Sequence, residues 1–159
     1  MFGMNMNNVA VTDGDRVEFE QRMGYHVDYY PVSSLMNYFK QGTDAEADAL
    51  VEEYKSLYTI KIDESGEEVY WQKVKNAAKA EIALRRVLKD EGATAFTTNF
   101  DDLGDADIDD PDFVGFDQIP GLASQRLMAE GYGFGAEGDW KTACLCRTLW
   151  VIQQGMPIG

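Results

Sequence analysis

Histidine and cysteine are scarce in this sequence, which contains one histidine and two cysteines. A metal site or catalytic triad that needs two imidazoles therefore cannot be built from this chain, and we interpret His26 as structural. Cys144 and Cys146 lie two positions apart in a predicted helix, so their side chains point to different sides and neither bridge nor chelate easily. Packed, reduced thiols of this kind are typical of a cytosolic protein.

Positive charge and long apolar runs are also lacking. There are 14 basic residues against 28 acidic ones, which gives a formal net charge of −14. Because each phosphate contact needs a cation, this balance argues against nucleic acid and anionic membrane as partners, but not against divalent metal ions. No apolar run approaches the length of a membrane span, and the first residues show no basic segment followed by a hydrophobic one. We therefore expect a cytoplasmic protein.

What the sequence does contain is an alternation of strand and helix patterns within 159 residues, enough for one packed domain. The predicted strands cover residues 8–12, 25–30, 93–100 and 132–137. The predicted helices cover residues 15–23, 32–41, 44–58, 67–91, 121–130 and 140–154, with an acidic loop at 101–118. Strands separated by helices pair in parallel through right-handed crossovers. The sequence therefore predicts an α/β fold with a small open, mainly parallel sheet and helices on both faces, of the flavodoxin-like, doubly wound kind.

The last predicted helix, 140–154, is apolar almost all round. Such a helix is either the central helix of a small domain or a terminal helix that needs cover from more protein. Periodicity alone leaves both interpretations open. Both ends of the chain look cut, so we expect it to be part of a longer polypeptide.

Two short motifs suggest ligands but fail in detail. Residues 133–138 (GFGAEG) match the G-x-G-x-x-G pattern of dinucleotide-binding proteins, yet those glycines should follow a strand and open a helix, with an acid about 20 residues further on. Here they lie within and just after a predicted strand. The loop at 101–112 holds seven aspartates, but it lacks the glycine and glutamate spacing of a calcium loop. We expect a solvated acidic loop and no nucleotide site.

Glu137 is the acid whose position is most informative. It follows a predicted strand and precedes a predicted helix, so it should lie at the carboxyl edge of the sheet, where open α/β folds place ligands. Neighbouring glycines leave it unshielded, and the helix start behind it favours negative charge. The alternative is that Glu137, like Asp139, merely serves the helix start.

Several longer segments resemble one enzyme family. Residues 131–143 (GYGFGAEGDWKTA) are similar to the signature of L-arabinose isomerases, and the match continues through 9–17 (VAVTDGDRV), 96–104 (FTTNFDDLG) and 118–134 (QIPGLASQRLMAEGYGF). The resemblance covers essentially the whole chain. It implies a cytosolic, usually manganese-dependent aldose–ketose isomerase that converts L-arabinose to L-ribulose, and often D-galactose to D-tagatose. It also implies homohexamers with active sites between subunits.

The resemblance implies a place for this chain within a subunit of three domains. Residues 1–138 are similar to the middle α/β domain, and residues 139–159 to the helix that leads into a C-terminal domain not contained in this sequence. Together they make up roughly a third of the family's length.

The resemblance also assigns site residues. The family mechanism passes through an enediol, with two glutamates and two histidines around the metal. Glu137 matches the first of these glutamates, as metal ligand and catalytic residue, and the other ligands lie beyond Gly159 in the family pattern. Met6 and Phe100 match apolar and aromatic residues of the substrate pocket, although ordinary packing explains either residue as well. We therefore expect the isolated chain to bind Mn²⁺ weakly or not at all and to be inactive.

The chain also departs from the family pattern in two respects. Met4 occupies a position where the family usually has an acid, and the two cysteines are not typical. Two further hypotheses stay open on sequence alone: a non-catalytic α/β assembly module derived from the family, and a small ligand-binding domain of flavodoxin-like form.

Overall fold

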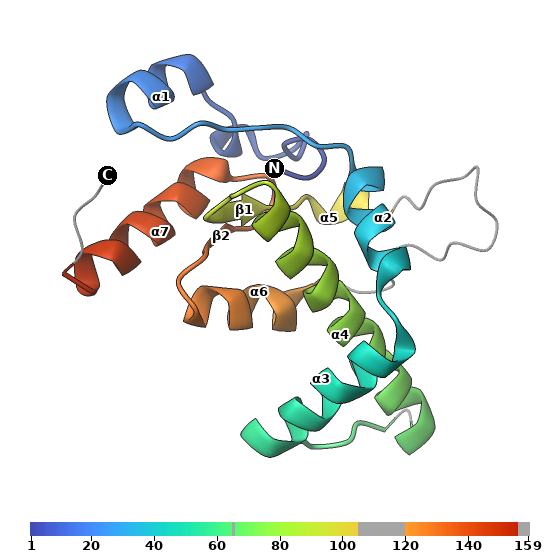
Figure 1. The fold of residues 1–159 in the computed structure, drawn as a ribbon. Coiled ribbons are helices and arrows are strands. Elements are labelled where there is room, and N and C mark those ends of the chain that lie inside the picture. Colours follow the sequence, from blue (N-terminus) through green and yellow to red (C-terminus); the bar gives the residue numbers. More distant parts are fainter. Residues whose placement is uncertain (65, 105–119, 156–159) are drawn as a thin grey trace.

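The computed structural model describes residues 1–64, 66–104 and 120–155, which form a mostly helical fold around two short parallel strands (Figure 1). In chain order the elements are the 3₁₀ helix η1 (Ala10–Thr12), α1 (Arg16–Met23), α2 (Val32–Gln41), α3 (Asp44–Leu57), α4 (Glu67–Asp90), β1 (Ala95–Thr97), α5 (Phe100–Gly104), α6 (Gly121–Ala129), β2 (Gly133–Gly135) and α7 (Trp140–Gln153). The predicted small α/β fold with a parallel sheet is confirmed. Most of the predicted acidic loop lies outside the described residues, and its first positions belong to α5.

The sheet pairs β1 with β2 in parallel, with Phe96 opposite Phe134. Phe2 extends this arrangement by single parallel bridges, to Thr98 on one side and to Tyr30 on the other. Helices lie on both faces of the sheet, as predicted (Figure 1).

The two faces are packed in different ways. Side chains alternate between the faces of a strand, and Phe96 and Phe134, whose ring centroids are 5.0 Å apart, belong to a core built with α4 and α6. On the opposite face Gly133 and Gly135 meet α7. A Cβ on Gly133 would lie 2.0 Å from the Ala143 carbonyl oxygen, so only glycine permits this close approach.

Two of the predicted strands are wrong. Residues 8–12 contain η1 instead, because Val11 is 77% exposed and the Thr12 hydroxyl donates to the Val9 carbonyl, closing a tight turn. β-branched residues favour a strand only where a half-buried face is available. Residues 25–30 reach the sheet only at Tyr30, which forms a single bridge with Phe2. The pairing stops there because the chain turns away after Phe2, at Gly3, which has a φ of +80°.

The predicted helices agree with the structure to within a few residues, and their predicted start signals are present. Thr43 forms a capping box with Glu46 at the start of α3, and Asp139 accepts from the Thr142 amide at the start of α7. None of the helices in the described ranges is long and apolar enough to cross a bilayer. Helix α7 keeps an exposed stripe of large apolar side chains at helical spacing: Leu145, Leu149 and Ile152.

Candidate functional site

The carboxyl ends of β1 and β2 meet at one edge of the sheet, and this edge collects the predicted site residues. The Gly138 amide donates to the Thr98 carbonyl over 3.1 Å, which joins the turn after β2 to the end of β1. The Met6 amide donates to the Glu137 carbonyl over 3.4 Å. Phe100 begins α5 two positions after Thr98, although its side chain lies outside the described part of the structure. The fold thus brings the backbones of all three predicted residues to this edge.

Glu137 has an unusual backbone conformation. Its φ is +62°, and it is the one non-glycine residue in the described ranges with a positive φ. Gly138 follows with a φ of +77°. A non-glycine residue held in the left-handed region costs on the order of 1–3 kcal/mol, and such residues cluster at functional sites. The half-buried Glu137 is therefore held in a turn that its own conformational preference does not favour.

The segment that carries Met4 runs beside this edge. The Met4 side chain is 65% exposed, and its amide donates to the Asp102 carboxylate over 2.6 Å. A Cβ on Gly3 would lie 2.4 Å from the same carboxylate oxygen, and the φ of +80° at Gly3 favours glycine as well. Asp102, in α5, thus fixes the first turn of the chain, a role that the family resemblance did not indicate.

The glycines of the G-x-G-x-x-G pattern have a packing function. A Cβ on Gly135 would lie 2.1 Å from the Asp139 carbonyl oxygen and 2.9 Å from the Ala143 nitrogen. Gly133 and Gly135 of the pattern therefore allow the direct contact of β2 with the backbone of α7.

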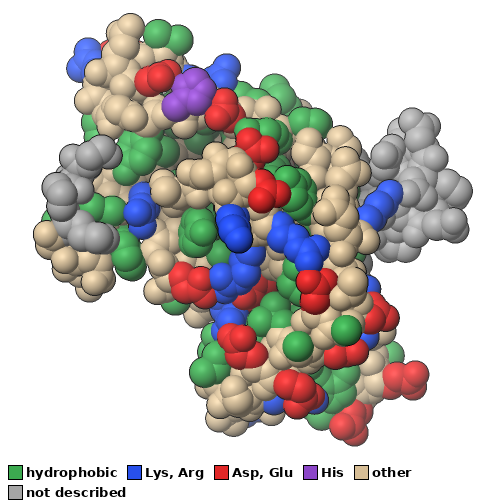
Figure 2. All heavy atoms as spheres, in the orientation of Figure 1, with side chains coloured by type: hydrophobic (Ala, Val, Ile, Leu, Met, Phe, Trp, Pro, Cys, Tyr) green, Lys and Arg blue, Asp and Glu red, His purple; other side chains and the backbone are tan. Residues whose placement is uncertain are grey.

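His26 lies elsewhere on the molecule. Its two ring nitrogens contact Glu20 at 3.1 Å and Asp28 at 2.9 Å, and Figure 2 shows it on the surface between acidic side chains. The hydrogen bond with Glu20, together with Asp28, raises the pKa of His26 above its usual value. A cavity of about 480 Å³ is lined by His26, Trp140 and Cys144 among others, but neither Met6 nor Glu137 contributes to it.

The two cysteines are free thiols. Cys144 is buried, and its burial raises the pKa of the thiol to about 11. Cys146 is half-buried. Within the part of the chain that the structure describes, no group of three histidine, cysteine, aspartate or glutamate side chains is placed to hold a metal ion.

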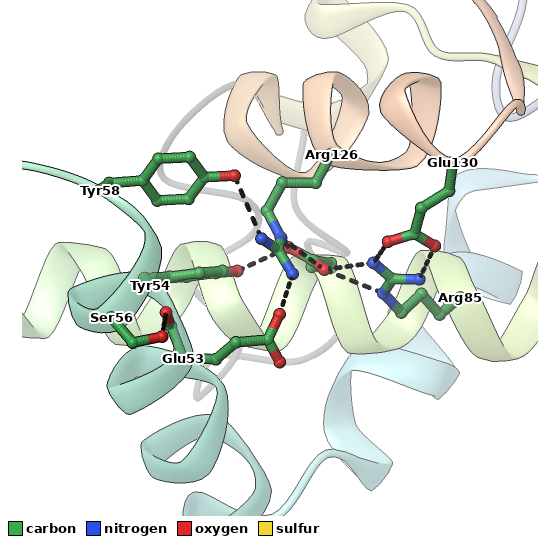
Figure 3. A network of polar contacts seen from close by, with 8 residues as sticks. Glu53, Tyr54, Ser56, Tyr58, Arg85, Arg126 and Glu130 are labelled. Carbon is green, nitrogen blue, oxygen red and sulfur yellow. Dashed lines mark hydrogen bonds and ion pairs between the residues drawn. The ribbon is translucent and has the colours of Figure 1, made fainter.

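A second polar cluster, the Glu81 network, joins α3, α4 and α6 (Figure 3). Glu81 is fully buried and accepts hydrogen bonds from Arg85, Arg126 and Tyr54. The outer members of the network are Glu53, Tyr58 and Glu130. Burial and the bond to Glu81 raise the pKa of the Tyr54 hydroxyl far above its usual value. Both oxygens of Glu81 have partners, so we interpret the network as structural.

The sequence contained one sign of this network. Glu81 lies four positions after Ala77 and three before Leu84 on the apolar stripe of the predicted helix 67–91. A carboxylate at a core position needs buried partners, but nothing in the sequence identifies Arg126 as the partner.

Comparison with known proteins shows the family. Residues 1–155 match the family described as the L-arabinose isomerase central domain, so this chain belongs to the L-arabinose isomerase family, as the motifs indicated. It is 63% identical over 160 residues to the L-arabinose isomerase of Bacteroides thetaiotaomicron and 62% identical to that of Phocaeicola vulgatus. The enzyme of Tolumonas auensis is 44% identical over 158 residues. Each alignment covers 99% of this chain but 30% of the relative, so the chain spans about a third of the length of these curated proteins.

Proposed function

We propose that the polypeptide containing this chain is an L-arabinose isomerase that converts L-arabinose to L-ribulose in the cytoplasm. The observation that carries the proposal is the placement of Glu137, whose carboxylate follows β2 at the carboxyl edge of the sheet in a strained left-handed turn. The proposal is supported by relatives named L-arabinose isomerase that match 99% of the chain. D-galactose, converted to D-tagatose, is the proposed second substrate.

We propose Mn²⁺ as the cofactor and Glu137 as one of its ligands. A carboxylate is a hard oxygen donor of the kind that suits Mn²⁺, and Glu137 is half-buried, so it is partly open to a ligand. The remaining ligands come from outside residues 1–159 in this proposal. When bound, the metal polarises the carbonyl and hydroxyl oxygens of the sugar.

The residues of this chain have three roles in the proposed site. Glu137 supplies an oxygen donor at a fixed position, of the kind that a hard divalent cation prefers. Met6, whose backbone is bonded to that of Glu137, supplies an apolar wall that limits water. Phe100, at the start of α5, supplies the aromatic contact to the sugar. Proton transfer between the two sugar carbons through an enediol needs such a fixed, sheltered arrangement.

The same proposal covers the assembly of the whole protein and the activity of the separate chain. The whole protein is proposed to form homohexamers whose active sites lie between subunits. The 159-residue chain by itself is proposed to be inactive and to bind Mn²⁺ weakly, since Glu137 is its single contribution to the coordination sphere. Micromolar Mn²⁺ affinity of the separate chain that survives Glu137→Gln contradicts the assignment of this ligand.

The decisive experiment is Glu137→Gln in the full native polypeptide, assayed for L-ribulose formation with Mn²⁺. Removing a charge that the site uses should lower kcat by about 100-fold or more, while the circular dichroism spectrum stays unchanged. Glu64→Gln, an exposed glutamate between α3 and α4, is the matched control and should keep full activity. Near-normal turnover of Glu137→Gln removes Glu137 from the mechanism, and a wild-type protein without L-arabinose turnover refutes the function.

A further inference from the structure

The side chain of Asn5 is bonded to the turn that carries Glu137. Its Nδ2 donates to the Gly138 carbonyl over 2.8 Å and to the Thr12 carbonyl over 2.8 Å. Its Oδ1 accepts from the Tyr29 hydroxyl over 3.4 Å. One half-buried amide thus joins the turn after β2 to η1 and to the segment before Tyr30.

The same turn needs external support. Glu137 and Gly138 are consecutive residues with positive φ, a conformation that a glutamate leaves unless its surroundings hold it. The contacts that hold it come from two sides. On the sheet side, Thr98 accepts from the Gly138 amide, and the Trp140 amide donates to the Gly138 carbonyl. On the other side, the Met6 amide donates to the Glu137 carbonyl and the Asn5 side chain to the Gly138 carbonyl.

Packing at Gly138 leaves little freedom for Asn5. A Cβ on Gly138 would lie 2.8 Å from the Asn5 Cα and 3.0 Å from the Met4 carbonyl oxygen. The backbone of Asn5 is therefore in direct contact with the turn, and its side chain bonds the carbonyl of the same glycine. The asparagine side chain is short enough to reach the Gly138 carbonyl from this close backbone position, over 2.8 Å.

We infer that Asn5 is a positioning residue that fixes the Glu137 carboxylate for metal binding by bonding the left-handed turn. The inference rests on the proposed function. Outer residues that orient a metal ligand typically change metal affinity or activity by about 10–100-fold when they are replaced. The geometry favours an amide: Asn5 donates to both the Gly138 and Thr12 carbonyls, and an ionised aspartate at this position has no donor. The Gly138 carbonyl also accepts from the Trp140 amide over 3.0 Å, so the Asn5 bond is the contact that ties the turn to the N-terminal segment.

The test measures Mn²⁺ affinity and isomerisation of the full native polypeptide with Asn5→Asp and Asn5→Ala. Both variants should weaken Mn²⁺ binding, followed by electron paramagnetic resonance of the free ion, by about 10–100-fold. The kcat for L-arabinose should fall to a similar extent at saturating sugar, with little change in KM. Asn8→Ala, an exposed asparagine of the same segment, is the matched control and should leave Mn²⁺ affinity unchanged.

A milder variant covers the case in which Asn5→Ala does not fold. Tyr29→Phe removes the hydroxyl that donates to the Asn5 Oδ1 and leaves the packing of the ring intact. It should weaken Mn²⁺ binding in the same direction by a few-fold. In a Glu137→Gln background neither Asn5 substitution should weaken Mn²⁺ binding further, because a positioning residue acts through the group that it positions.

The outcomes separate this inference from the proposed function. If Glu137→Gln abolishes activity and Mn²⁺ binding while folded Asn5→Asp keeps both, the role of Asn5 is refuted and the function stands. If Glu137→Gln keeps both, the ligand assignment fails, and the role of Asn5 fails with it. A lower unfolding temperature of Asn5→Asp with unchanged Mn²⁺ affinity also refutes positioning, because it shows a structural role alone.

Discussion

The Nε of Arg126 lies 2.9 Å from the Oε2 of Glu81, and this pair joins α6 to α4 inside the Glu81 network. Glu81 is fully buried and Arg126 is 8% exposed. Burial alone lowers the pKa of Arg126, but its hydrogen bonds to Glu81, Tyr58 and Glu53 outweigh that effect and keep the guanidinium charged. Helix α6 leads into β2, so the pair also anchors the strand that precedes Glu137.

Arg126→Met should lower the free energy of unfolding by about 3 kcal/mol, the lower end for a broken buried ion pair, because Glu81 keeps Arg85 as a charged partner. Urea denaturation of the 159-residue chain measures the effect. Arg86→Met is the control, since Arg86 bonds Glu46 in a more exposed ion pair and should change stability by less than about 1 kcal/mol. Equal losses in the two variants contradict the distinct role of the buried pair.

Acid should destabilise the chain through three carboxylates whose pKa values lie below the ordinary ones. Hydrogen bonds lower the pKa of Glu130 (from Arg85), of Asp44 (from Lys79) and of Glu46 (from the Thr43 amide). A lowered pKa in the folded state means that the unfolded chain binds more protons as the pH falls. The stabilisation is complete above the ordinary values of 3.8 for Asp44 and 4.5 for the two glutamates. It is lost as the pH drops through the lowered values.

The urea midpoint, measured from about pH 6 to about pH 3, should therefore fall mainly below about pH 4.5. Lys79→Gln removes the main partner of Asp44 and should make the acid-induced fall smaller. A midpoint that rises on acidification has the wrong sign for this explanation.

Gly135→Ala should separate α7 from the sheet. Its Cβ would meet the Asp139 carbonyl oxygen at 2.1 Å, and backbone atoms cannot move aside as a flexible side chain can. We expect a loss of about 3 kcal/mol or more in the free energy of unfolding, at the upper end of overpacking effects. Gly121→Ala, at the start of α6 with nothing near its Cβ position, should be neutral or stabilising by up to about 1 kcal/mol. Comparable thermal unfolding of both variants contradicts the packing explanation.

Glu137→Asn should stabilise the separate chain while it abolishes isomerisation by the full native polypeptide. Asparagine tolerates the left-handed region better than glutamate does, so the strain at φ +62° is partly relieved, by up to about 1 kcal/mol. Glu137→Gln removes the charge without this relief and serves as the comparison. The prediction fails if the asparagine variant unfolds at a lower temperature than the glutamine variant.

The helices were predictable because their start signals and apolar stripes are local. Thr43 and Asp139 cap helices at the predicted positions. The strands were predictable only where helices cover them: β1 and β2 lie within predicted strands, while residues 8–12 have no buried face to support one.

Part of the candidate site could also be predicted, because it depends on local sequence. The location of Glu137 follows from a strand–helix junction, which is a local feature. Asn5 could not be found from the sequence, because its bond to the Gly138 carbonyl joins residues 133 positions apart and a single asparagine carries no periodic signal.

The 133 positions that separate Asn5 from Gly138 in the sequence also predict an order of folding. Helices α3 and α4 are neighbours in the chain and meet through a short connection, so their contacts form at a small loop-closure cost. The bond between Asn5 and Gly138 requires nearly the whole chain to close on itself, and such non-local contacts slow folding. We therefore expect the α3–α4 pair to form first, and the turn that carries Glu137 to acquire its shape only when the two distant segments of the sequence have met.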